Sequence, residues 1–131
     1  MRLLLDTHIA LWAILGDRRL PKVATDLISD DGNDVIVSAV SIWEISIKHA
    51  LARGRPNDMP LSGQDALSYF REAGYGLLAI VADHAAAVES LPPLHADPFD
   101  RLLVAQAHIE PMRLITRDQN LSGYGSMVQV V

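Results

Sequence analysis

The sequence begins with Met1-Arg2-Leu3-Leu4-Leu5-Asp6-Thr7, in which a short apolar run ends at a carboxylate. The run is too short for a helix and is typical of a strand buried on both faces. In an open parallel sheet, ligands bind in the crevice at the carboxyl ends of the strands. Asp6 is therefore a candidate for that crevice, although a single strand-end Asp serves equally well as a turn residue or a helix cap.

Strand-like and helix-like runs alternate along the whole chain. Strands are predicted at residues 2–5, 34–38, 77–81, 113–116 and 127–131, and helices at residues 8–15, 21–29, 41–53, 64–73, 83–91 and 97–108. Strands separated by helices imply right-handed crossovers. The pattern predicts an α/β fold with three layers, in which a central, mainly parallel sheet of about five strands has helices on both faces.

Half of the 131 residues are apolar, and the chain contains no cysteine. A chain of this length fits a single domain, which we expect to span residues 1–131. The lack of thiols excludes disulfides, thiolate metal sites and a cysteine nucleophile. Neither a leader-like start nor an apolar run of membrane-spanning length is present, so we expect a cytoplasmic protein without a membrane anchor.

The net charge of −5 has the wrong sign for a protein that coats nucleic acid by bulk electrostatics. It does not exclude a nuclease, because acids that hold divalent cations have their charge offset locally.

Further acids stand at positions where they can join Asp6. Glu44 is flanked by apolar residues in a predicted helix, where it can either form an ion pair with Lys48, four residues later, or face the crevice. In the second case Lys48 would contact a phosphate or weaken the local negative field. Asp118 follows the strand at 113–116, and its alternative role is that of a turn or cap residue.

Two more acids, Asp97 and Asp100, open the helix predicted at 97–108. Asp97 is suited to cap the helix, since Pro98 fits its first position. Asp100 lies one turn deeper and is then the better ligand, although the helix dipole also favours an acid there. Converging carboxylates repel one another and raise their own pKa values unless a cation separates them. Oxygen ligands suit Mg²⁺ or Mn²⁺, which can activate a water molecule as a nucleophile.

Four fragments, in this order and spacing, resemble PIN-domain ribonucleases, and more narrowly the VapC-type toxins of toxin–antitoxin pairs. The fragments are Leu4-Leu5-Asp6-Thr7-His8, Ser41-Ile42-Trp43-Glu44-Ile45 with Lys48, residues 97–107, and Leu114-Ile115-Thr116-Arg117-Asp118. The resemblance implies a PIN-like fold and a Mg²⁺- or Mn²⁺-dependent endoribonuclease that hydrolyses RNA phosphodiester bonds.

The resemblance also implies a set of site residues and partners. The metal-binding and catalytic acids match Asp6, Glu44, Asp100 and Asp118, with Asp6 and Asp100 favoured as direct ligands. Thr7 and Thr116 would orient a ligand or contact phosphate, and Lys48 would contact the substrate. His8 and His95 are not expected to act as bases, and His95 is interpreted as a loop residue. The implied partners are RNA, a cognate VapB-like antitoxin, and a second copy of the chain in a homodimer.

Two other classes remain as alternatives. A phosphatase or phosphotransferase would use Asp6 as its nucleophile, but that chemistry calls for Asp-x-Asp, and this chain has Asp6-Thr7-His8. A Mg²⁺-binding, receiver-like signalling module would need paired acids before its phosphoacceptor and a lysine at the end of a late strand, and the sequence has neither.

Overall fold

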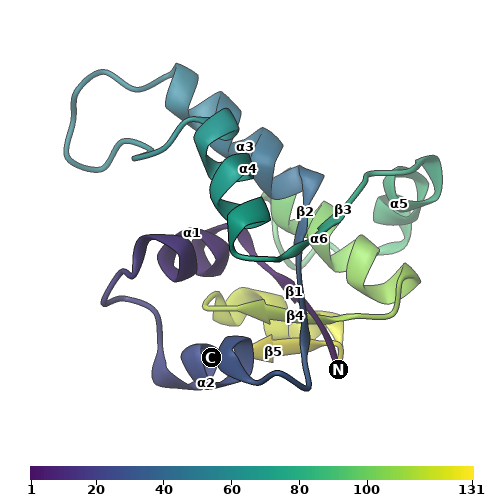
Figure 1. Cartoon of the computed structure of the whole chain (residues 1–131). Helices are drawn as coiled ribbons and strands as arrows, with labels where there is room; N and C mark the ends of the chain where they lie inside the picture. Colours follow the sequence, from purple (N-terminus) through teal and green to yellow (C-terminus); the bar gives the residue numbers. More distant parts are fainter.

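The computed structural model describes residues 1–131 and has a five-stranded sheet between layers of helices (Figure 1). All strand pairings are parallel, and the strand order is β3-β2-β1-β4-β5. The strands are β1 (Arg2–Leu5), β2 (Asp34–Ser38), β3 (Gly76–Leu78), β4 (Arg113–Thr116) and β5 (Val128–Val130). The predicted three-layer α/β fold is therefore confirmed.

The central strand, β1, supplies side chains to both faces of the sheet. Leu3 and Leu5 belong to one apolar core, and Leu4, which lies between them, belongs to the other. This alternation follows from the two-residue period of a strand, and all three leucines are fully buried. The apolar opening of the chain thus joins the two halves of the interior.

The helices complete the two outer layers. They are α1 (Thr7–Leu15), α2 (Lys22–Ser29), α3 (Ala39–Ala50), α4 (Gly63–Glu72), α5 (Ala82–Ala87) and α6 (Pro98–Ile109), with 3₁₀ turns η1 (Val88–Ser90) and η2 (Gln119–Tyr124). Buried residues of α1, α2 and α4 pack with Leu3 and Leu5, whereas those of α6 and η2 pack with Leu4. Helix α3 contributes to both cores. None of the helices combines the length and the apolar character needed to cross a membrane.

The chain order places a crevice beside β1. The connections from β1 to β2 and β3 build the sheet outward in one direction, whereas β4 and β5 lie on the other side of β1. Ligand crevices form where the chain reverses in this way, at the carboxyl ends of the strands. Asp6 stands at this point, and its backbone N–H donates to the Ile115 carbonyl of β4 at 3.0 Å.

Two predicted elements are shorter than expected. The strand predicted at 77–81 is confined to β3, because the Ala79 carbonyl accepts from the Gln106 amide at 3.3 Å and the Val81 N–H donates to His84 Nδ1 at 3.1 Å. These side chains take the place of a neighbouring strand. The helix predicted at 83–91 divides into α5 and η1, where Arg101 binds the Val88 carbonyl at 3.1 Å.

The other boundaries differ by a few residues. Helix α3 begins directly after Ser38, whose hydroxyl caps it by accepting from the Val40 N–H at 3.0 Å. It ends at Ala50, so the loop before α4 is longer than predicted and projects from the molecule (Figure 1).

Replacing Leu4 by alanine is expected to lower the free energy of unfolding by about 2–5 kcal/mol, because it leaves a cavity beside the central strand. Leu77 is the matched control, since it lies on the edge strand β3 and is 42% exposed. Its replacement by alanine should cost about 1 kcal/mol or less. Urea unfolding followed by circular dichroism measures both, and equal losses would contradict this account of the core.

Candidate metal centre

Asp6 is fixed at the carboxyl end of β1 through both carboxylate oxygens. One oxygen caps α1 by accepting from the Ile9 N–H at 2.9 Å. The other accepts a short hydrogen bond from the hydroxyl of Thr116, the last residue of β4. Asp6 is only 5% exposed and Thr116 is fully buried. The capping role and the crevice position suggested by the sequence therefore coexist in one side chain.

Glu44 approaches from α3 and is equally constrained. The Thr7 hydroxyl donates to one of its oxygens at 2.6 Å, and Lys48 Nζ contacts the other at 2.6 Å. Thr7 is buried, and because its single hydrogen is donated to Glu44, its oxygen accepts from the Ser41 hydroxyl at 3.0 Å. Both threonines singled out in the sequence are thus bonded to acids. Lys48 forms the ion pair with Glu44 and remains 44% exposed.

The two acids at the start of α6 have different roles. Asp97 caps the helix, accepting from the N–H groups of Phe99 at 2.8 Å and Asp100 at 3.2 Å. Asp100 lies within the first turn and directs its carboxylate toward the crevice, where Oδ2 is 3.1 Å from Nε2 of His95.

Asp118 completes the group from the turn after β4. One of its oxygens caps η2 by accepting from the Asn120 N–H at 2.9 Å, and the other lies 2.9 Å from His95 Nε2. Its backbone N–H donates to the Thr116 hydroxyl at 3.0 Å. Thr116 therefore links Asp118 to Asp6.

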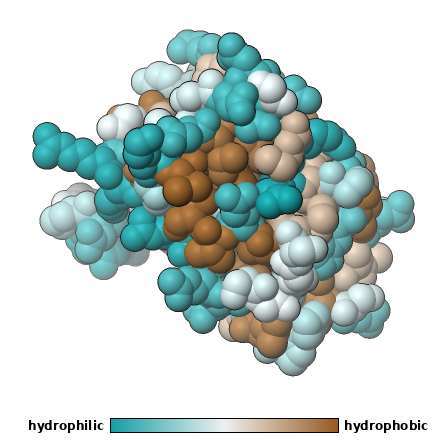
Figure 2. Space-filling model, turned by 90° about the horizontal axis from the view of Figure 1, so that it is seen from below, coloured by the Kyte–Doolittle hydropathy of each residue, from teal (hydrophilic) through white to brown (hydrophobic).

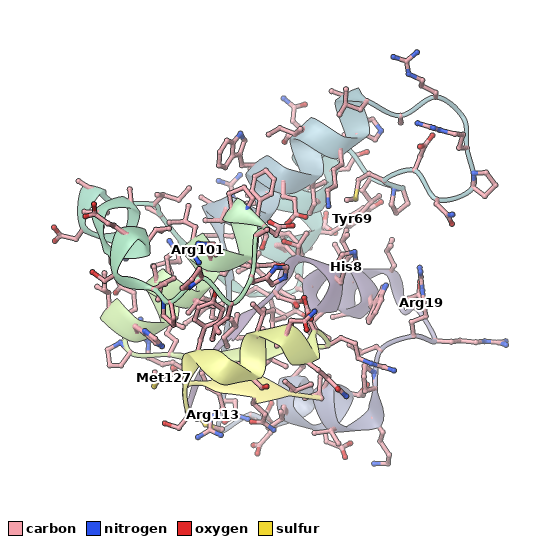
Figure 3. The ribbon with its side chains drawn as sticks, turned by 180° about the vertical axis from the view of Figure 1, so that it is seen from behind. His8, Arg19, Tyr69, Arg101, Arg113 and Met127 are labelled. Carbon is pink, nitrogen blue, oxygen red and sulfur yellow. The ribbon has the colours of Figure 1, made fainter.

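The structure brings all four predicted acids to one pocket of about 510 Å³. It is lined by Asp6, His8, Trp12, Arg19, Glu44, Lys48, His95, Asp97, Asp100, Arg117 and Asp118. In Figure 3, His8 lies on α1 near the middle of the molecule and Arg19 lies toward its edge. Thr7 and Thr116 do not line the pocket and lie behind the acids that they contact.

Burial and mutual repulsion disfavour full ionisation of this group. Burial is the main cause that raises the pKa of Asp6. Burial, reinforced by the negative charges of Asp97, Asp6 and Glu44, raises the pKa of Asp100 to about 7. The nearby cations therefore do not fully offset the negative charge of the pocket.

The pocket residues fit a hard divalent cation. Their donors are carboxylate oxygens from separate elements, the class of ligand that suits Mg²⁺ and Mn²⁺. A cation would also offset the negative charges of Asp97, Asp6 and Glu44, which add to the effect of burial in raising the pKa of Asp100. Single carboxylate oxygens of Asp100 and Asp118 already lie within 4.8 Å of each other.

His95, Arg19 and Arg117 line the pocket but are not among the site residues that the sequence predicts. His95 is the one of the three that contacts the predicted acids. It does lie in a loop, between η1 and α6, as expected. Its imidazole, however, reaches two of the four predicted acids. In the sequence, His95 stands two residues before the helix cap Asp97. This position indicates that His95 lies near the start of α6, but it does not indicate where the side chain points.

Comparisons with known proteins agree with this fold. Residues 3–126 match the family model of the PIN domain. The chain is 31% identical over 122 residues to ribonuclease VapC22 of Mycobacterium tuberculosis, covering 92% of this chain and 90% of that protein.

Two solved structures share the fold at low sequence identity. One is VapBC2 from Rickettsia felis bound to a DNA fragment from their promoter, with a TM-score of 0.68, 16% identity, and coverage of 100% of this chain and 98% of that chain. The other is a toxin–antitoxin complex from Klebsiella pneumoniae, with a TM-score of 0.63, 18% identity, and coverage of 98% and 96%. Because the PIN-domain family model matches residues 3–126 of this chain, the chain belongs to the PIN-domain family.

Proposed function

We propose that this protein is a metal-dependent endoribonuclease and the toxin of a toxin–antitoxin pair. The observation that carries the proposal is the convergence of Asp6, Glu44, Asp100 and Asp118 from four separate elements on one pocket. The similarity to ribonuclease VapC22 supports RNA as the substrate class. We further propose that residues 1–131 act as a single domain.

The four acids would share the work of holding Mg²⁺ or Mn²⁺. We assign direct contact to Asp6 and Asp100, and assign Glu44 and Asp118 to completing the cluster. Thr7 and Thr116 keep the carboxylates of Glu44 and Asp6 in place by donating hydrogen bonds. When bound, the cation supplies charge stabilisation for the phosphate and lowers the pKa of the attacking water.

Cationic side chains at the pocket support binding of a phosphate backbone. Arg19, Lys48 and Arg117 line the same pocket as the acids. Because a phosphodiester is repelled by carboxylates, these cations give the substrate an attractive rim around a negative centre. Lys48 is suited to this role as well as to its contact with Glu44, since its side chain is partly exposed.

We infer that a VapB-like antitoxin is the protein partner. The two structures that share this fold are VapBC2 and a toxin–antitoxin complex. An unrestrained ribonuclease would degrade the RNA of its own cell, so the proposed activity requires an inhibitor.

We also propose a homodimer, supported by apolar surface on the helices. Trp43 and Ile47 on α3 and Leu51, the residue that follows its last turn, are spaced four residues apart and are 51%, 37% and 62% exposed. The face in Figure 2 also carries an apolar patch ringed largely by polar side chains. Trp12 and Ile42, on the early helices, are partly buried against the core.

The two alternative classes have less support. The PIN-domain match favours a nuclease over a phosphatase or a receiver-like module.

Asp6→Asn and Asp100→Asn are each expected to reduce RNA cleavage by about 100-fold or more, because each removes a negative charge from the cation site. Cleavage of total RNA with Mg²⁺ or Mn²⁺ measures this, and EDTA should abolish cleavage by the wild-type protein. Asp97→Asn is the matched comparison. Asparagine also caps helices, so this variant should keep most of the activity.

Cleavage by a folded Asp6→Asn protein at the wild-type rate would refute the assigned chemistry. Formation of an aspartyl-phosphate with acetyl phosphate would instead support the phosphotransfer or receiver-like class. Circular dichroism should accompany each assay, so that loss of activity is not confused with loss of fold.

The affinity for Mn²⁺ is expected to rise with pH. Because the pKa of Asp100 is about 7 in the metal-free protein, a proton occupies this carboxylate at about pH 6 and competes with the cation. Raising the pH to about 8 removes that proton, and the affinity should rise by up to about tenfold per pH unit below the pKa. Calorimetry in two buffers measures both affinity and proton release. Equal release by wild type and Asp100→Asn would contradict the assignment.

Arg117→Ala is expected to weaken RNA binding and to lower its salt dependence, because Arg117 lines the pocket. The slope of log affinity against log salt should fall by about 0.7 for a lost phosphate contact to a single strand. Arg113→Ala is the matched control, since Arg113 lies at the other end of β4, away from His8 and Arg19 (Figure 3). RNA binding is measured in the Asp100→Asn background, in which cleavage is expected to be reduced. Equal effects of Arg117→Ala and Arg113→Ala would argue against RNA binding at the pocket.

A further inference from the structure

His95 joins the two acids at the outer side of the pocket. Its Nε2 lies 2.9 Å from Oδ2 of Asp118 and 3.1 Å from Oδ2 of Asp100. Its side chain is 20% exposed, so the contact is partly shielded from water. A single ring nitrogen therefore stands between a carboxylate from α6 and one from the turn after β4.

The other ring nitrogen indicates which atom carries the proton. The backbone N–H of Asp97 points at Nδ1 of His95, at 3.4 Å. A neutral imidazole has one acceptor and one donor nitrogen. Since Nδ1 faces a donor, it is the acceptor, and Nε2 carries the hydrogen that Asp100 and Asp118 share.

The loop that carries His95 is attached to the helix that carries Asp100. Arg101 follows Asp100 in α6 and donates to the carbonyl oxygens of Pro92 at 3.0 Å, Leu91 at 3.4 Å and His95 at 3.5 Å. Figure 3 shows Arg101 enclosed by the ribbon of this region. One guanidinium thus sets the position of the imidazole relative to the carboxylate.

The geometry points to His95 as a positioning residue for the cation site. It holds Asp100 and Asp118 together by donating its Nε2 hydrogen to both, and it does not itself bind the cation. A ligating histidine would need a lone pair on Nε2 and a hydrogen on Nδ1, directed at the Asp97 N–H. The inference relies on the proposed function for the presence of the cation.

This arrangement opposes the repulsion between the two carboxylates. Without a hydrogen-bond donor between them, the like charges of Asp100 and Asp118 would push the two side chains away from each other. With the imidazole in place, both carboxylates keep their orientation before a cation arrives. Hydrogen bonds to ligating carboxylates of this kind typically change metal affinity by about 10-fold to 100-fold.

The test is Mn²⁺ affinity measured by calorimetry at about pH 8. His95→Ala should weaken binding by about 10-fold to 100-fold. His95→Gln should recover most of the affinity, because its amide supplies an N–H at a similar distance from the backbone. His49→Ala is the matched control, since His49 is exposed and lines no pocket of the site. Circular dichroism confirms that each variant is folded.

Two spectra separate positioning from ligation. Long-range ¹H–¹⁵N NMR of the metal-free protein should report a hydrogen on Nε2 of His95. Pulsed EPR of the Mn²⁺-loaded protein should show no directly coordinated nitrogen. Nitrogen coupling that disappears in His95→Ala would make His95 a ligand and overturn the inference.

The affinities also separate this inference from the proposed function. Wild-type affinity in His95→Ala, or equal losses in the alanine and glutamine variants, would overturn the positioning role alone. A wild-type protein that binds no Mn²⁺ would overturn the proposed metal dependence, and the positioning role with it.

Discussion

Repulsion among carboxylates gathered at one point of the sheet is the constraint on which the site depends. The strand order brings Asp6 and Asp118 to the same crevice, and α3 and α6 add Glu44 and Asp100. A hydrogen-bond donor contacts each acid. Thr116 contacts Asp6, and Thr7 and Lys48 contact Glu44. His95 contacts both Asp100 and Asp118. Burial, with an added contribution from the negative charges of Asp97, Asp6 and Glu44, still raises the pKa of Asp100.

The fold was largely predictable because its signals are local. The run Leu3-Leu4-Leu5 has no polar residue, as expected of a strand covered on both faces, and its two-residue period assigns side chains to the two cores. The boundaries near Ala79 and Val88 were not predictable. They are set by Gln106 and Arg101, side chains that are distant in sequence.

The four acids that line the pocket could be singled out in the sequence, whereas the contacts that support them could not. A carboxylate at a strand end or helix start can be recognised in a sequence, and Pro98 allowed Asp97 to be distinguished as the cap. The direction of the His95 ring depends on a loop with no regular period, whose path is fixed by hydrogen bonds to Arg101. Sequence patterns carry no information about such bonds, so the sequence indicates only that His95 lies in a loop.

Asp6 illustrates how one side chain can serve stability and chemistry together. One of its oxygens holds the first turn of α1, while the whole carboxylate contributes to a repulsive cluster. Its loss would remove a helix cap and relieve repulsion at the same time, so the two effects on folding oppose each other. A substitution of Asp6 would therefore change activity far more than it changes the amount of folded protein in the cell.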